Sequence, residues 1–181
     1  MIYLFYSFLT MSRKKYCIIV LIFIVVTILS LFIILINEHS DNTSYSFDVN
    51  SIHNDIENRN VQLSMQPTKN TMCIFFNTEC DFCIEELLYI KDNLDIFSCK
   101  YNLILISFED TQKLIDYKNT ILSKDKSSSM IFVSDSNFEL MEKYNVSVFP
   151  TILVFSKDGV QKSRCTGINI DFLEQLKSNI Q

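Results

Sequence analysis

Histidine, tryptophan and clusters of positive charge are scarce in this sequence of 181 residues. It has two histidines and no tryptophan, and its formal net charge is −5. No stretch is rich in arginine or basic along one face, which argues against nucleic acid as a partner. Internal repeats and low-complexity segments are also lacking. The length therefore predicts one ordinary domain with an appendage.

One long apolar run dominates the N-terminal part. Residues 16–36 carry no charge and are numerous enough to cross a bilayer as a helix. A cleaved signal peptide would have a shorter apolar core and a small-x-small site after it, and residues 37–40 offer no such site. We therefore expect a retained membrane anchor. The basic residues 13–15 precede it, so residues 1–15 are expected in the cytoplasm and the remainder outside, on the periplasmic side. Met11, just before that basic cluster, is an alternative start.

The chain after the anchor divides into a linker and a globular part. Residues 37–60 are polar and predict a linker or stalk, and residues 61–181 predict the domain. Apolar and polar residues alternate over 61–65, as in an edge strand. Helical spacing predicts one long helix over 81–97. Apolar runs then alternate with helical patterns up to an Asp-Gly hairpin signal at 158–159. The order predicts an α/β fold with a mixed central sheet flanked by helices.

Two cysteines, Cys80 and Cys83, follow the apolar run 72–76 after a short polar loop. Apolar residues recur at helical spacing beyond them, which predicts strand, tight turn and helix, with Cys80 near the helix N-terminus. Unpaired backbone N–H groups and the helix dipole stabilise a thiolate there. The pair therefore suits thiol–disulfide exchange, although a structural disulfide or a zinc site also uses this spacing.

A zinc site is disfavoured because further ligands are missing. Structural zinc takes four ligands, usually a second Cys-x-x-Cys or a histidine pair. Both histidines, His39 and His53, fall in the predicted linker, and Cys73, Cys99 and Cys165 stand singly. We predict no metal site, and buried apolar character for these three cysteines.

Pro150 interrupts an apolar run that otherwise predicts a central strand, and it is one of only two prolines. Proline cannot donate to the hydrogen-bond ladder, so it needs an explanation. A cis peptide between Phe149 and Pro150 at the strand start is one explanation. A trans proline in an edge strand is the other, and this stretch alone does not decide between them.

Together the two elements resemble the thioredoxin superfamily over residues 60–181. Cys80-Asp81-Phe82-Cys83 is similar to its redox motif, and Phe149-Pro150-Thr151 is similar to its cis-proline loop. Glu86 extends the first motif to Cys-x-x-Cys-x-x-Glu, which resembles membrane-anchored bacterial thiol–disulfide oxidoreductases, including those of cytochrome c maturation. The resemblance implies that Cys80 is the nucleophile, Cys83 the resolving thiol and Pro150 the wall that receives the substrate. Asp81, Phe82, Phe149 and Thr151 are then the surface that selects the partner.

The sequence also departs from the family pattern. Glu79 stands where a tryptophan is usual, no proline lies between the cysteines, and Ile74 occupies the position of the buried acid of thioredoxins. Glu86 is therefore the candidate acid–base group, provided that it is buried. A solvated first-turn glutamate is the alternative.

Acidic residues crowd the motif: Glu79, Asp81, Glu85 and Glu86. No lysine, arginine or histidine lies within it. Negative neighbours disfavour a thiolate, and strongly oxidising pairs have a stabilised one. The composition of the motif thus favours a reductant or isomerase over a strong oxidase.

The sequence predicts an anchored thiol–disulfide oxidoreductase that acts on exported proteins. It would need no cofactor beyond a redox-active Cys80–Cys83 disulfide. An upstream membrane electron donor would supply the electrons that reduce this disulfide again. One alternative is a soft-metal-binding or delivery module, which would require an added histidine ligand. The other is a peroxide-reducing module, which would require an activating arginine beside the nucleophile. After residue 59 the sequence contains one arginine, Arg164.

Overall fold

The computed structural model describes residues 18, 20–30, 45–48, 52, 54–121 and 129–178. The chain divides into two compact units, Met1–Thr43 and Ser44–Gln181. In the first unit, residues 20–30 are helical. The rest of the predicted anchor at 16–36 lies largely outside the described residues. Among those described, no helix has both the length and the apolar character needed to span a bilayer.

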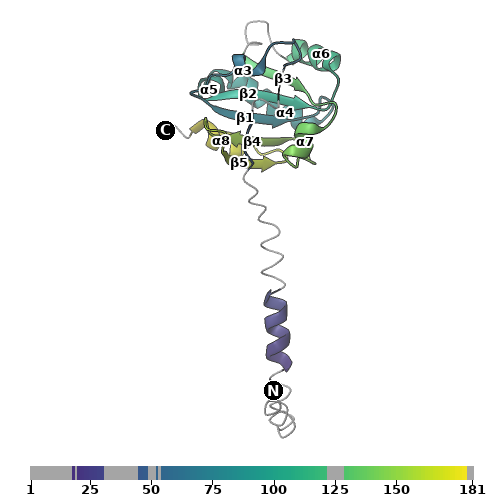
Figure 1. Ribbon diagram of the computed structural model, residues 1–181, viewed down its shortest axis with the longest axis vertical. Coiled ribbons are helices and arrows are strands. Elements are labelled where there is room, and N and C mark those ends of the chain that lie inside the picture. Colours follow the sequence, from purple (N-terminus) through teal and green to yellow (C-terminus); the bar gives the residue numbers. More distant parts are fainter. Residues whose placement is uncertain are drawn as a thin grey trace. The chain divides into compact units, whose positions relative to one another are not determined.

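The second unit is built on a five-stranded mixed sheet (Figure 1). The strand order is β3-β2-β1-β4-β5, with β1, β2 and β3 parallel and β4 antiparallel to both β1 and β5. The strands are Asn70–Phe75 (β1), Tyr101–Ser107 (β2), Met130–Ser134 (β3), Thr151–Phe155 (β4) and Gln161–Thr166 (β5). The predicted α/β class and mixed sheet are confirmed.

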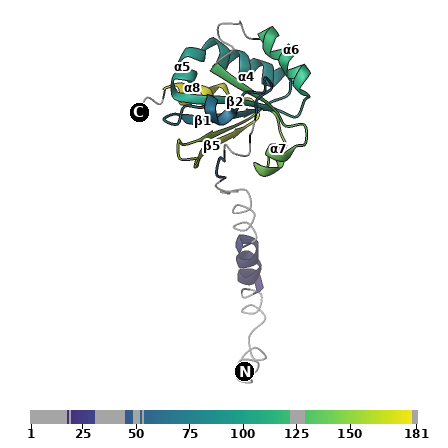
Figure 2. The same ribbon diagram turned by 45° about the horizontal axis from the view of Figure 1, so that its top comes forward.

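Helices cover both faces of the sheet, with α4, α5 and α6 on one face and α7 on the other (Figure 2). The described helices are α3 (Val61–Ser64), α4 (Asp81–Asp92), α5 (Leu94–Lys100), α6 (Thr111–Ile121), α7 (Glu139–Lys143) and α8 (Ile170–Ser178). Leu173 and Leu176 of α8 join the same core cluster as α4.

The central strands are apolar runs because both of their faces are buried. Every residue of β2 and all but the first residue of β1 are buried. Alternate residues of β1 point to opposite faces. Met72 and Ile74 enter the core beneath α4, whereas Cys73 and Phe75 enter the core beneath α7. Continuous apolar sequence is the expected pattern for strands buried in this way.

Two predicted elements differ from the structure. Residues 61–65 do not form an edge strand, because Val61–Ser64 is the short helix α3, capped by the Asn60 side chain. The alternation was misleading, since Val61 is buried while Leu63 is exposed. The long helix over 81–97 is in fact α4 and α5, which meet at Asn93.

The described part of the predicted linker packs on the domain. Ile52 and Ile56 are buried in the core, and the Ile56 N–H donates to the Phe132 carbonyl of β3 at 2.9 Å. Asp55 accepts hydrogen bonds from the backbone N–H groups of Glu57 and Arg59. The polar side chains of Asp55, Glu57 and Arg59 pair with one another or with the backbone in this packed segment, so polarity alone did not indicate a linker here.

Candidate functional site

The sheet register brings three loops to one edge. Phe75 at the end of β1 is the register partner of Ile106 in β2 and of Thr151 at the start of β4. The loops that follow β1 and β2 and the loop that precedes β4 therefore leave the sheet side by side. Both predicted motifs meet there: Cys80 and Cys83 follow β1, and Pro150 precedes β4.

Cys80 is the N-cap residue of α4. Its Sγ accepts a hydrogen bond from the Cys83 N–H at 3.3 Å, and its own N–H donates to the Asn77 carbonyl at 3.3 Å. A side-chain acceptor in this position takes one of the N–H groups that a helix leaves unpaired in its first turn. Cys80 is half-buried, so its sulfur is held by the helix and also open to a partner.

Cys83 lies one turn into α4 and is fully buried. Burial raises the pKa of its thiol to about 12, helped by the hydrogen bond and negative charge of Cys80 and by the charge of Glu86. A hydrogen bond with the Asn77 backbone acts in the opposite direction. Both cysteines are free thiols in this structure, so it represents the dithiol form.

Glu86 is buried beside this thiol, with only 1% of its surface exposed. Its Oε1 accepts from the Asn169 N–H at 3.4 Å, and its Oε2 is a buried atom with no hydrogen-bond partner among the described residues. Burial raises the pKa of the Glu86 carboxyl to about 7, and the Asn169 N–H opposes that rise. The burial on which the acid–base hypothesis depends is therefore present.

The peptide bond between Phe149 and Pro150 is cis, as one of the two interpretations predicted. Pro150 directly precedes β4, which lies between β1 and β5, so the strand is not an edge strand. The Pro150 carbonyl accepts from the Gly167 N–H at 2.8 Å, and the Thr151 hydroxyl donates to the Val148 carbonyl at 2.8 Å. The loop is thus held from both of its ends.

Several aromatic side chains lie at this edge of the sheet, and Phe149 packs against the same core cluster as Cys80. Phe82, between the two cysteines, is 60% exposed. The ring of Phe149 lies 5.7 Å from that of Phe108, which stacks at 5.6 Å on Phe138. We call Phe149, Phe108 and Phe138 the aromatic row. The sequence analysis missed Phe108 and Phe138, although Phe108 directly follows a parallel strand, where site residues are commonly found.

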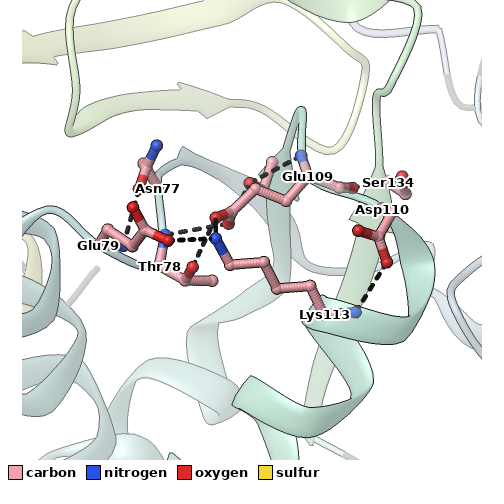
Figure 3. Close-up of polar contacts among 8 residues, drawn as sticks. Asn77, Thr78, Glu79, Glu109, Asp110, Lys113 and Ser134 are labelled. Atoms are coloured by element: carbon pink, nitrogen blue, oxygen red, sulfur yellow. Dashed lines mark hydrogen bonds and ion pairs between the residues drawn. The ribbon is translucent and has the colours of Figure 1, made fainter.

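A polar cluster behind the Cys80 loop was also missed (Figure 3). The Glu109 carboxylate accepts from the Thr78 N–H at 3.0 Å and from the Thr78 hydroxyl at 2.5 Å. Lys113 of α6 reaches Glu109 at 2.7 Å and Glu79 at 2.6 Å. Glu109 and Lys113 are spaced i,i+4, which is a detectable pairing signal. Nothing in the local sequence predicts that both residues contact the Cys80 loop, which lies more than thirty residues earlier in the chain.

Lys113 changes the electrostatic picture that the motif alone predicts. The sequence analysis counted four acidic residues and no cation within the motif, but α6 supplies a cation from outside it. The ion pair with Glu79 offsets one of these charges, and Glu86 is partly protonated near neutral pH because its pKa is about 7. Asp81 and Glu85 are exposed to solvent, which screens their charges, so the acidity around Cys80 is weaker than the composition of the motif suggests.

Within the described parts of the chain, no group of three or more His, Cys, Asp and Glu side chains is arranged to hold a metal ion. Arg164, the arginine that a peroxide-reducing site would need, donates instead to the carbonyls of Tyr144 and Asn145 at 2.9 and 2.7 Å.

No family model matches this sequence, and no curated protein is significantly similar to it. Solved structures do resemble its fold. StoA from Bacillus subtilis is 21% identical with a TM-score of 0.53, over 70% of this chain and 92% of that one. A secreted Mycobacterium tuberculosis disulfide oxidoreductase is 14% identical with a TM-score of 0.53, over 71% and 94%. A Plasmodium vivax 2-Cys peroxiredoxin is 15% identical with a TM-score of 0.53, over 68% and 85%.

These similarities establish the thioredoxin-like fold, so the resemblance predicted from the two motifs is confirmed at the level of the fold. The matched proteins include both a disulfide oxidoreductase and a peroxiredoxin. The fold alone therefore does not select a reaction, and the choice has to come from the residues of the site.

Proposed function

We propose that this chain is a membrane-anchored thiol–disulfide oxidoreductase that reduces or exchanges disulfides of exported proteins. The observation that carries the proposal is the asymmetry of the cysteine pair. Cys80 caps α4 and is partly open to solvent, whereas Cys83 is fully buried one turn away. An accessible nucleophile beside a protected resolving thiol is the arrangement that thiol–disulfide exchange requires.

The reaction begins with the Cys80 thiolate. It attacks one sulfur of a substrate disulfide, so that a mixed disulfide forms and the other substrate sulfur leaves as a thiolate. Cys83 then loses its proton and attacks the Cys80 sulfur. The Cys80–Cys83 disulfide forms and the second substrate thiol is released. Two electrons have passed from the dithiol to the substrate, and no cofactor takes part.

Glu86 is placed to accept the proton of Cys83. With a pKa of about 7, its carboxyl is about half ionised at neutral pH. Two causes of the high pKa of Cys83 are the hydrogen bond and the charge of Cys80. Both disappear when Cys80 enters the mixed disulfide, because its sulfur is then uncharged. The Cys83 pKa thus falls toward that of Glu86 at the step that needs proton transfer.

The substrate chain lies against the cis-proline loop. Pro150 and Thr151 are buried and form the floor, while Phe149 is half-buried and Phe82 is exposed near Cys80. Asp81 is an exposed acid in the same region. The aromatic row extends this surface, so polypeptide segments with apolar side chains near the disulfide suit it.

The pair works as a reductant or isomerase. A thiolate at the cysteine pair is disfavoured by the negative charges of Glu79, Asp81 and Glu85. Lys113 offsets part of this effect through its ion pair with Glu79. The reduction potential of the Cys80–Cys83 pair tests this direction. A value near −120 mV, about that of the strongly oxidising members of the fold, would contradict it.

The anchor comprises residues 16–36, with the N-terminus in the cytoplasm and the domain on the periplasmic side. Its support is the uncharged run and the basic residues 13–15 before it. A dithiol that is oxidised in each cycle needs an electron source, and outside the cytoplasm that source is a membrane dithiol donor. A C-terminal alkaline phosphatase fusion, active only outside the cytoplasm, should be active. An inactive fusion with normal expression would contradict the topology.

Turnover of a protein disulfide by the full chain tests the reaction. Cys80→Ser should abolish reduction of the disulfide, and the control Cys99→Ser, which alters an exposed thiol on α5, should leave the rate unchanged. If Cys80→Ser still turns over, the proposal fails. The alternatives have weaker support here: Arg164 binds backbone carbonyls away from Cys80, and no third soft ligand joins the cysteine pair within the described residues.

A further inference from the structure

The loop that carries Cys80 is fastened from outside by a buried carboxylate. Glu109 accepts both donors of Thr78, the backbone N–H at 3.0 Å and the hydroxyl at 2.5 Å. Thr78 is two residues before Cys80, and the Cys80 N–H in turn donates to the Asn77 carbonyl. Figure 3 shows the Glu109 side chain pointing into this loop. The contact therefore acts on the backbone immediately before the nucleophile.

Glu109 is itself fixed to strands other than the one that leads to Cys80. Its Oε2 accepts from the Ser107 hydroxyl of β2 at 3.0 Å, and its carbonyl accepts from the Ser134 hydroxyl of β3 at 2.7 Å. Lys113, in the first turn of α6, adds an ion pair at 2.7 Å. The carboxylate thus has a fixed position relative to the sheet, and its hydrogen bonds to Thr78 hold the loop of residues 77–79 in a fixed position too.

The partners keep Glu109 ionised in spite of its burial. Burial acts to raise the pKa of this carboxyl, but the hydrogen bonds from Lys113, Thr78 and Ser107 outweigh burial and hold the pKa below its ordinary value. The ion pair with Lys113 contributes little to stability, because the lysine side chain is 41% exposed and solvent screens the attraction of the charges. What it does provide is a defined geometry, since a carboxylate with several short hydrogen bonds has few alternative positions.

We propose that Glu109 is a positioning residue for Cys80. It holds the loop of residues 77–79 so that the Cys80 sulfur stays at the N-terminus of α4, as the N-cap acceptor of the Cys83 N–H. Without this tie the loop relaxes and the sulfur leaves the helix N-terminus. The importance of this role for turnover rests on the proposed function, but the position of the sulfur does not.

The sharpest test leaves every charge in place. Thr78→Val removes the hydroxyl donor and keeps the shape, while Thr78→Ser keeps both donors. The readout is the rate of Cys80 alkylation in the reduced full chain, divided by the rate at the exposed Cys99 in the same sample and measured by peptide mass spectrometry. We expect Thr78→Val to lower this ratio about fivefold, which corresponds to the usual free energy of an N-cap interaction. Thr78→Ser should keep the wild-type ratio.

Glu109→Gln separates positioning from simple electrostatics. Loss of a nearby negative charge alone would speed alkylation and move its pH profile to lower pH. Loss of positioning slows alkylation and moves the profile to higher pH, and this is the result expected. The matched control Asp110→Asn changes a neighbouring exposed acid that caps α6 through the Lys113 N–H. It should leave the ratio unchanged.

An unchanged or increased ratio in Thr78→Val or Glu109→Gln would overturn the proposal, and so would a fall in the ratio that Thr78→Ser fails to restore. Unfolding midpoints of the variants, measured alongside, ensure that alkylation is read on folded protein. The alkylation ratio does not depend on any substrate. Its outcome is therefore independent of whether Cys80→Ser abolishes disulfide turnover, so failure of this inference and failure of the proposed function are distinguishable.

Discussion

Glu86 should make the protein less stable and more active, and the two effects can be separated by pH. Its carboxyl has a pKa of about 7, against an ordinary value of 4.5, because burial penalises the ionised form. A difference of two to three units corresponds to about 3 kcal/mol of folding free energy. In Glu86→Gln a neutral amide of similar shape takes the place of the carboxyl.

The sign follows from which state binds the proton more tightly. Below pH 4.5 the carboxyl is protonated in both the folded and the unfolded chain, so it causes no pH dependence. Between pH 4.5 and pH 7 the unfolded chain ionises first and is favoured. The wild-type free energy of unfolding should therefore fall across this window by about 3 kcal/mol relative to Glu86→Gln, and the difference should stay constant above it.

The assay is urea unfolding of the full chain in a mild detergent, at several pH values from 4.5 to 8. Far-ultraviolet circular dichroism is the suitable signal, because the protein has no tryptophan. The control is Glu85→Gln, the exposed neighbour on the same turn of α4. Its unfolding free energy should follow the wild-type pH dependence.

Activity should change in the opposite direction. In a single turnover at pH 7, resolution of the mixed disulfide by Cys83 should slow by about tenfold or more in Glu86→Gln, since a general base typically contributes that much. The reasoning is refuted if Glu86→Gln keeps the wild-type pH dependence of stability. It is also refuted if the variant resolves the mixed disulfide at the wild-type rate.

Two further predictions concern the resolving thiol and the segment of residues 54–60 that packs on the domain. Cys83→Ser should accumulate mixed disulfides with exported proteins, visible as reductant-sensitive adducts in non-reducing gels, whereas Cys99→Ser should accumulate none. The buried Lys118 pairs with the partly exposed Glu57 at 2.5 Å. Glu57→Gln, which leaves the buried ammonium without an anionic partner, should therefore lower the free energy of unfolding by about 1–3 kcal/mol. Lys118→Met should cost less than Glu57→Gln, and the reverse order in urea unfolding would contradict this account.

The sequence predicted the parts of the site that have a local signal. The run before Cys80 and the helical spacing after Cys83 correctly placed the cysteine pair after β1, at the N-terminus of α4. Pro150 within an apolar run correctly marked a position that needed an explanation, and of the two interpretations left open the structure shows the cis peptide bond. Each of these features depends on residues close together in the chain, so the pattern was sufficient.

Other parts of the site depend on contacts that are distant in sequence. Lys113 reaches Glu79 because the turn after β2 returns α6 to the edge where the Cys80 loop lies. Polar residues 54–60 gave a linker pattern, although Ile56 contributes its backbone to the edge of β3. Neither contact could be inferred before the order of the strands was known.

The pairing of β1 with β4 has a consequence for the newly made chain. Phe75 and Thr151 are register partners, yet they are far apart in the sequence. During synthesis the cysteine pair emerges long before Pro150, and β4 completes the site only after most of the domain has emerged. Until then Cys80 and Cys83 are ordinary thiols without a substrate-binding wall. Under the proposed function, the nascent chain would therefore expose both cysteines before it can act on a disulfide itself, and it would gain that activity only once β4 has paired with β1.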